Sequence, residues 1–166
     1  MPLLYYVSVS IHVLSAMLWI GGMLFLGVVG APALRAVDPP AVRQRLFQQL
    51  GLRFRLVGWW AIGLLIATGT INLYYRGWLL WDGVLGSAAF WRTPQGHALA
   101  FKLGAVAAML VVSSIHDFVL GPQAGAAVPG SPGALVLRRR AALLARTNAM
   151  LGVLVVLAAV RLARVG

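Results

Sequence analysis

Lys102 is the residue whose position most clearly calls for chemistry. It is the only lysine beside thirteen arginines, and it lies in an apolar segment, Ala98–Ile115, that contains no other charge. Burying an ionisable side chain in hydrocarbon costs at least ~2.5–3.5 kcal/mol on insertion scales. Lysine can also lose its proton on burial and become a neutral amine ligand or a base. We therefore expect Lys102 to act as a ligand or as a base. The alternative is that its side chain snorkels to the membrane interface.

His12 is the second candidate for chemistry. The polar side chains of the first apolar run share one helical face; they are Tyr5, Ser8, His12, Ser15 and Trp19. An imidazole well inside a bilayer has little water to bond, so His12 is a candidate ligand for a metal or a cofactor. Gly21 and Gly22 follow near this stripe, and glycines there would let a flat group approach the backbone.

Other side chains fall on faces that would point into a bundle. The third run contributes Lys102, Met109, Ser113 and His116, the second Thr68, Thr70 and Asn72, and the fourth Arg146, Thr147 and Asn148. Small polar residues commonly knit membrane helices together, so packing explains many of them. Met109 is either a core residue or a ligand. His116 with Asp117 is either a buried pair that closes one end or part of a metal site.

The composition is that of an integral membrane protein. The chain is 61% hydrophobic, has a mean hydropathy of +0.88 and contains only three acidic residues. Its net charge of +11 does not indicate nucleic-acid binding, because the arginines are divided among the connections between apolar runs. The absence of cysteine excludes disulfides, thiolate metal sites and iron–sulfur clusters. Hydrolytic motifs are also missing, so hydrolysis is not expected.

Four apolar runs, each near the ~20 residues that a membrane span needs, follow one another. They are roughly Leu3–Val29, Leu56–Tyr75, Ala98–Leu120 and Ala141–Leu162. Short connections rich in Pro, Gly and Arg predict an all-α integral membrane protein, an up-down-up-down bundle of four transmembrane helices that forms one domain over residues 1–166. Ala41–Leu52 is predicted to form a separate interfacial helix capped by Asp38. No internal repeat beyond the helix count is visible.

The arginines predict the orientation of this bundle. Nine of them fall in or beside the first and third connections: Arg35, Arg43, Arg45, Arg53, Arg55, Arg138, Arg139, Arg140 and Arg146. The positive-inside rule then predicts that both termini lie outside. Aromatic residues gather at the opposite ends of the spans: Tyr5, Tyr6, Tyr74, Tyr75, Trp78, Trp81 and Trp91. Counting ~1.5 Å per residue places His12 ~6 Å and Lys102 ~9 Å from the midplane, at nearly the same level.

Four motifs resemble the CopD-like (copper resistance D) family. They are the first-helix sequence from Ile11 to Gly22, Arg53-Phe54 followed by Thr68–Asn72, the helix start from Thr93 to Leu103, and His116–Pro122. The resemblance covers nearly the whole chain and implies a copper transport or copper resistance protein of the bacterial inner membrane.

The same layout also resembles HemJ-type protoporphyrinogen oxidases. These are four-helix proteins that bind haem b, with an essential histidine on the first helix and an essential lysine on the third. The matching positions are His12 and Lys102, and the fourth-helix asparagine of the pattern would be Asn148. The chain departs from this pattern in its glycines after Trp19 and in lacking a glutamate after Asn148.

Two functions are therefore expected. The first is a haem b protein with a redox role, either electron transfer or oxidation of a small reductant or porphyrin, so an oxidoreductase activity is left open. Its cofactor-binding residues would be His12, Lys102, Trp19, Gly22, Met109 and Asn72.

The alternative is copper transport or resistance. Its metal ligands would be His12, Lys102 and His116, with a path along Met17, Met23, Met109 and Met150. A subunit without a cofactor is the third hypothesis. Expected partners are the lipid bilayer and a redox partner or small substrate, not nucleic acid; a homo-oligomer is left open.

Overall fold

The computed structural model describes residues 3–79 and 84–164, and four helices in these ranges are long and apolar enough to cross a membrane. They are Leu3–Arg35, Pro40–Tyr75, Pro94–Ala126 and Pro132–Ala163. No strand occurs in the described ranges, so the predicted all-α membrane fold with four spans is confirmed. Helices of 32 to 36 residues are roughly 50 Å long, and they therefore extend beyond a hydrocarbon core of about 30 Å.

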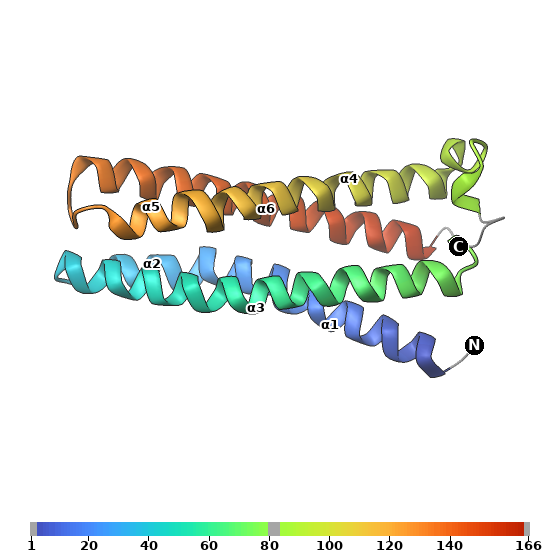
Figure 1. Cartoon of the computed structure of the whole chain (residues 1–166), viewed down its shortest axis with the longest axis horizontal. Helices are drawn as coiled ribbons and strands as arrows, with labels where there is room; N and C mark the ends of the chain where they lie inside the picture. Colours follow the sequence, from blue (N-terminus) through green and yellow to red (C-terminus); the bar gives the residue numbers. More distant parts are fainter. Residues whose placement is uncertain (1–2, 80–83, 165–166) are drawn as a thin grey trace.

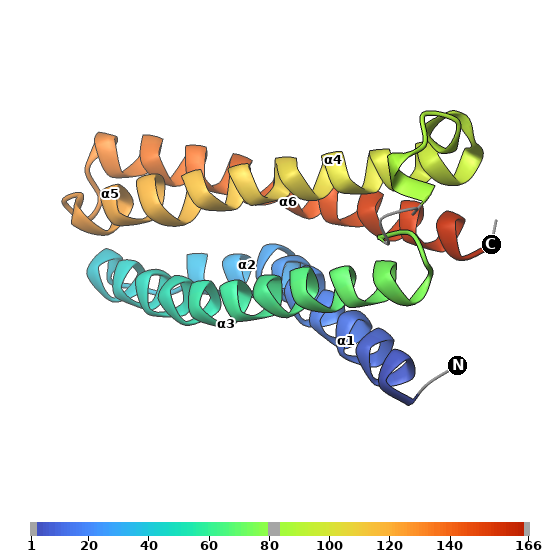
Figure 2. The same cartoon turned by 45° about the vertical axis from the view of Figure 1, so that its right-hand side comes forward.

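The spans pack as two helical hairpins. Helix α1 (Leu3–Phe25) packs along α3 (Pro40–Tyr75), and α4 (Pro94–Ile115) packs along α6 (Pro132–Arg164). Figures 1 and 2 show the hairpins side by side, with α1 leaning away from the other hairpin toward its N-terminal end. Contacts between the hairpins join α6 to α1 and α3 to α5 (Gly121–Ala126), which leaves α1 and α4 diagonally opposite.

The two ends of the bundle differ in which connections they hold. The connections 36–39 and 127–131 lie at one end, called here the loop end (left in Figure 1). The start of α1, the end of α6 and the connection between α3 and α4 lie at the other, called here the terminal end. That connection contains two 3₁₀ turns, η2 (Val84–Gly86) and η3 (Phe90–Arg92).

Two spans contain a π-helical turn toward the loop end. The turn η1 (Leu26–Gly30) lies between α1 and α2 (Ala31–Arg35), and η4 (His116–Leu120) lies between α4 and α5. The amide of Ala31 bonds the Leu26 carbonyl and that of Gly121 bonds the His116 carbonyl, five residues back instead of four. Pro32 and Pro122 follow these turns. Proline lacks an N–H and clashes with the carbonyl four residues earlier, so the α-helical ladder is disturbed at this point in both spans.

The separate interfacial helix predicted for Ala41–Leu52 is wrong. These residues form the first turns of α3, which continues without interruption to Tyr75. Asp38 is not the cap either: Pro39 holds that position, and Asp38 lies 3.7 Å from Arg43 in an exposed ion pair.

Gln44 is the reason that the start of α3 stays in the bundle. Its Nε2 donates to the Ala127 carbonyl at 2.8 Å, and Arg138 donates to its Oε1 at 2.6 Å. This buried amide ties the first hairpin to the second at the loop end, which an interfacial helix lying on the membrane could not do.

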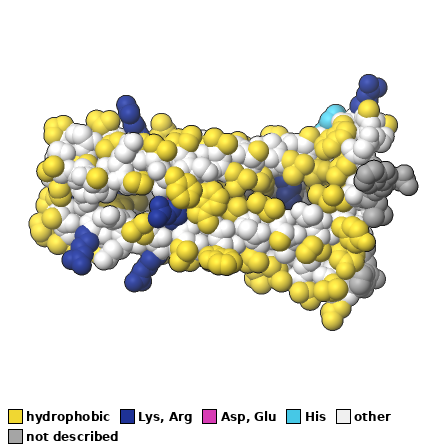
Figure 3. Space-filling view, viewed as in Figure 1, with side chains coloured by type: hydrophobic (Ala, Val, Ile, Leu, Met, Phe, Trp, Pro, Cys, Tyr) yellow, Lys and Arg dark blue, Asp and Glu magenta, His cyan; other side chains and the backbone are white. Residues whose placement is uncertain are grey.

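The outer surface is mostly apolar, as lipid contact requires. Large side chains such as Val28 and Trp60 are exposed over 73% and 71% of their surface. Figure 3 shows hydrophobic side chains along the bundle, with most of the visible basic side chains in the half toward the loop end.

Aromatic side chains gather at the terminal end, as predicted. Tyr5, Tyr74 and Tyr75 make edge-on contacts there. Trp78 and Trp91 both pack on Phe90 in the same region, and Trp81 lies outside the described residues.

Candidate functional site

His12 is half-buried on α1 and is hydrogen-bonded to α3. Its Nδ1 lies 2.8 Å from Thr68 Oγ1, and the Thr68 hydroxyl donates to the Leu64 carbonyl at 2.6 Å. A hydroxyl has one proton, so Nδ1 is the donor to Thr68. The Leu65 carbonyl is a further backbone acceptor near the ring. In a neutral imidazole held this way, Nε2 keeps the free lone pair, which is the arrangement that metal-binding histidines adopt.

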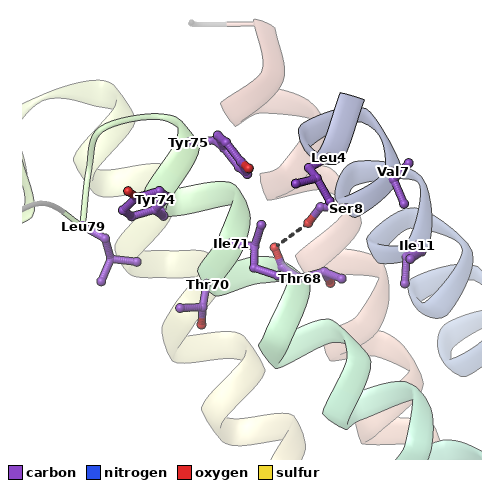
Figure 4. A pocket seen from close by; sticks show the side chains of 10 residues that line it. All are labelled: Leu4, Val7, Ser8, Ile11, Thr68, Thr70, Ile71, Tyr74, Tyr75 and Leu79. Carbon is purple, nitrogen blue, oxygen red and sulfur yellow. Dashed lines mark hydrogen bonds between the residues drawn. The ribbon is translucent and has the colours of Figure 1, made fainter. Parts of the chain in front are cut away.

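The Thr68-Gly69 step of α3 is shaped to receive this ring. A Cβ built on Gly69 would lie 3.4 Å from His12 Cε1, at van der Waals contact distance, so the ring lies directly against this glycine. The Ser8 hydroxyl donates to the Thr68 carbonyl at 3.3 Å, as Figure 4 shows, and fastens α1 one turn nearer the terminal end. The sequence suggested only a packing role for Thr68. The neighbouring Gly69, which leaves space for the imidazole, is the sequence signal that could have identified Thr68 as the partner of His12.

The structure places Lys102 within electrostatic range of His12. Lys102 lies on α4, largely enclosed, and is near enough to His12 and Arg76 for their charges to interact. Among residues 3–79 and 84–164, the two carboxylates, Asp38 and Asp117, pair elsewhere. Within the described chain, Lys102 therefore has no anionic partner.

A cluster of buried apolar side chains lies further toward the loop end. Trp19 and Met109 belong to one buried cluster with Ala61 and Ile62, and Met109 is 0% exposed. The predicted candidates Trp19 and Met109 thus belong to the same core cluster, seven residues along their helices from His12 and Lys102.

Asn148 forms the next polar level. Its Nδ2 donates to Ser113 Oγ at 2.8 Å and to Met23 Sδ at 3.3 Å, so one amide joins α6 to both α4 and α1. Its Oδ1 is buried and has no hydrogen-bond partner in the described part of the chain. Asn148 was expected among the inward-facing polar residues and from the fourth-helix pattern, but its contact with the Met23 sulfur was not predicted.

His116 and Asp117 form a pair toward the loop end. Their Nδ1 and Oδ1 atoms are 2.9 Å apart, and Trp59 Nε1 donates to the other carboxylate oxygen at 3.0 Å. The carboxylate therefore holds His116 Nδ1 and leaves its Nε2 free. His116 lies far from His12 along the bundle, so the structure does not unite His12, Lys102 and His116 in one site. The described residues contain no group of three or more His, Asp or Glu side chains placed to hold a metal ion.

The remaining predicted residues have other surroundings. The space where a Gly22 side chain would stand is filled by the Phe54 ring, so this glycine serves helix packing and gives no flat surface to a cofactor. A Cβ on Gly21 would meet nothing within 4 Å, and this glycine faces outward. Asn72 lies near the end of α3, and its Oδ1 is buried without a partner among the described residues.

An apolar groove of about 570 Å³ lies between α1 and α3 near the terminal end (Figure 4). It is lined by Leu4, Val7, Ser8, Ile11, Thr68, Thr70, Ile71, Tyr74, Tyr75 and Leu79. Neither His12 nor Lys102 lines it, so this groove is not a cofactor slot built around these two donors.

Comparison with known proteins identifies one family. The family model described as "Copper resistance protein D" matches residues 48–162, which include Lys102, Met109 and Asn148 but not His12. A protein of Aquifex aeolicus (strain VF5), described as "Uncharacterized protein", is 36% identical over 115 residues, covering 69% of this chain and 68% of that protein. No solved structure matches the chain.

Proposed function

Because the chain belongs to the copper resistance protein D family, we propose that it handles copper within the bilayer and binds copper(I) through His12. The observation that carries the proposal is the hydrogen bond from His12 Nδ1 to Thr68, which assigns the proton to Nδ1 and the lone pair to Nε2. Imidazole and thioether groups are suitable copper(I) ligands, and both kinds line the interior of this chain, at His12 and Met109.

Lys102 determines the conditions under which copper can occupy this position. An ammonium group beside His12 would repel a copper ion, and no protein anion in the described chain screens it. Copper bound at His12 therefore requires Lys102 to be a neutral amine, which could itself serve as a second donor. Binding of copper is then accompanied by release of the Lys102 proton.

The first test is copper(I) binding by the purified protein in competition with a chelator of known affinity. We expect His12→Ala to weaken binding by about tenfold or more, the scale on which metal sites respond to lost interactions. His97→Ala is the matched control, because His97 is exposed at the start of α4. Equal affinity in His12→Ala and the wild type would refute the assignment of His12.

Lys102 variants test the proton linkage. Lys102→Arg carries a permanent charge and should lose copper binding at His12 at every pH, whereas Lys102→Met should bind with little dependence on pH. The wild type should lose affinity as the pH falls, because the ammonium form competes with copper. An arginine variant that binds like the wild type would contradict this account.

A haem b site is the second candidate function. The specific observation that favours it is that Lys102 lies within electrostatic range of both the His12 imidazole and a second cation, Arg76. His12 would hold the iron and the two cations would suit the propionate groups, and haem would supply one-electron redox chemistry. The donor atoms fit a haem, but the described space does not. Neither His12 nor Lys102 lines the groove between α1 and α3, and the Phe54 ring occupies the space beside Gly22.

One spectrum separates the two candidates. Protein purified from haem-replete cells should be colourless under the copper proposal, whereas a haem protein shows a Soret band that His12→Ala removes. We also propose that the chain is a single domain located in a bacterial inner membrane. In this orientation both termini lie outside and the arginine-rich loop end lies in the cytoplasm.

A further inference from the structure

The two hairpins repeat each other at a constant separation of 90 residues. The π-helical turns Leu26–Gly30 and His116–Leu120 are 90 residues apart, and so are the prolines that follow them, Pro32 and Pro122. The helices that precede the turns end at Phe25 and Ile115, again 90 residues apart. An irregular feature placed identically in both halves indicates that each half is a copy of one structural unit.

Burial follows the same separation. On the first helices, buried positions coincide at Ser8 and Ala98, Ser15 and Ala105, and Trp19 and Met109. On the second helices they coincide at Gln44 and Ala134, Gly58 and Asn148, Ile62 and Gly152, and Thr68 and Ala158. None of these seven pairs keeps the same residue type, but both members of every pair are buried. The repeat therefore includes the packing faces as well as the chain path.

Parallel hairpins repeated in this way are related by a pseudo-twofold axis along the bundle. Because α1 and α4 are diagonally opposite, the equivalent residues on their inner faces approach the axis from two sides. Three such pairs lie in the same regions of the bundle. His12 and Lys102 interact electrostatically, Trp19 and Met109 share a buried cluster, and Met23 and Ser113 bond the same amide of Asn148.

Side chains of the types that bind copper(I) alternate between the two hairpins in this register. The first level pairs His12 with Lys102, the second Met109 with Trp19 and the third Met23 with Ser113, and the 90-residue separation pairs His116 with Leu26 at the fourth. These levels are seven, four and three residues apart, or about 10, 6 and 4.5 Å at ~1.5 Å per residue. The longest interval contains the small buried pair Ser15 and Ala105.

We infer that the chain is a tandem repeat of one helical hairpin, and that copper(I) moves along the pseudo-twofold axis between the repeats through His12, Met109, Met23 and His116. This inference rests on the proposed copper function and extends it from binding to passage. Movement occurs by exchange of imidazole and thioether ligands, for which the flexible methionine side chain is suited. The buried Asn148 amide holds the Met23 sulfur and stands at the third level of the path.

The test is uptake of copper(I), or of silver(I) as its analogue, into proteoliposomes that contain an indicator. Met109→Leu and Met23→Leu conserve volume but remove the sulfur, and each should slow uptake by about tenfold or more. Met17→Leu and Met150→Leu are matched controls, because these methionines are 65% and 66% exposed and face outward. The controls should retain wild-type uptake.

A swap across the axis tests the repeat itself. Met23→Ser alone should slow uptake, and adding Ser113→Met returns a thioether to the same level from the other hairpin. We expect the double variant to recover to within about threefold of the wild type, since the two positions are equivalent and their total volume is kept. Elution of each variant as a single species in detergent confirms that it is folded.

The outcomes separate the two claims. Copper binding at His12 with equal uptake in the axial and control methionine variants would overturn the axial path while leaving the proposed function in place. A folded swap variant that stays as slow as Met23→Ser would overturn the equivalence of the hairpins. A wild-type protein that neither binds nor takes up copper or silver would overturn both.

Discussion

At the scale of single residues, the hydrogen-bond partner of His12 decides what the imidazole can do. The Thr68 hydroxyl donates its single proton to the Leu64 carbonyl, so it accepts a hydrogen bond from His12 Nδ1. The sequence pattern located His12 and its polar stripe correctly on an inward face, since Ser8, Ser15 and Trp19 are buried. Thr68 was not identified as the partner, because the pairing depends on how α1 and α3 are rotated against each other.

Removing the Thr68 hydroxyl should therefore weaken copper binding without removing the ligand. We expect Thr68→Val to lower the affinity by about 10- to 100-fold, the effect typical of lost hydrogen bonds to metal-binding histidines. Thr70→Val is the matched control, because the exposed Thr70 hydroxyl bonds the Ile66 carbonyl of its own helix, at 2.9 Å. Nitrogen NMR of labelled histidine should show a changed tautomer in the first variant only; equal affinities would remove Thr68 from the site.

At the scale of elements, the spans were predictable and their irregularities were not. Hydropathy and length locate a membrane helix, which is why all four spans were found. The π-helical turns depend on hydrogen bonds that shift by one residue around Pro32 and Pro122, and hydropathy does not register such a shift. The start of α3 was mistaken for an interfacial helix because its charged residues resemble one, whereas Gln44 holds it to the other hairpin.

At the start of α4, the close contact of Gly96 with the η3 turn can be tested by measuring stability. A Cβ on Gly96 would collide with the Phe90 carbonyl oxygen and come within 2.8 Å of Trp91 Cα, so Gly96→Ala should cost about 1–3 kcal/mol of stability through overpacking. Gly104→Ala, in the same helix, meets nothing within 4 Å and should gain up to about 1 kcal/mol from helix propensity. Thermal unfolding in detergent measures both, and a Gly96→Ala variant as stable as the wild type would contradict the contact.

At the scale of the whole molecule, the internal repeat is the feature that sequence inspection missed. The halves share burial at seven equivalent positions but not the residues there: Ser8 corresponds to Ala98, and Gly58 to Asn148. Replacing one small residue by another preserves packing and erases the visible similarity. His12 and Lys102 could still be placed at one level by counting residues, because both lie at the same point of equivalent helices.

The orientation of the bundle is tested by labelling. The chain has no cysteine, so a single introduced cysteine is the only site that a thiol reagent can modify. Ala41→Cys and Val128→Cys lie at the loop end, and Leu79→Cys lies in the connection at the terminal end. In intact cells, a membrane-impermeant maleimide should modify Leu79→Cys and spare the other two, since positive charge favours the cytoplasmic side. The reverse pattern would invert the proposed topology.

The π-helical turns also determine how the chain can change in length. Each accommodates one residue more than an α-helical turn, so a deletion inside it regularises the helix instead of breaking it. Everything beyond the deletion would rotate by about 100° and shift by about 1.5 Å relative to the rest of the span. A deletion in η1 alone would turn α2 away from its position while α5 kept its own. Length changes at these turns therefore preserve the arrangement of the two halves only when they occur in pairs, one in each hairpin.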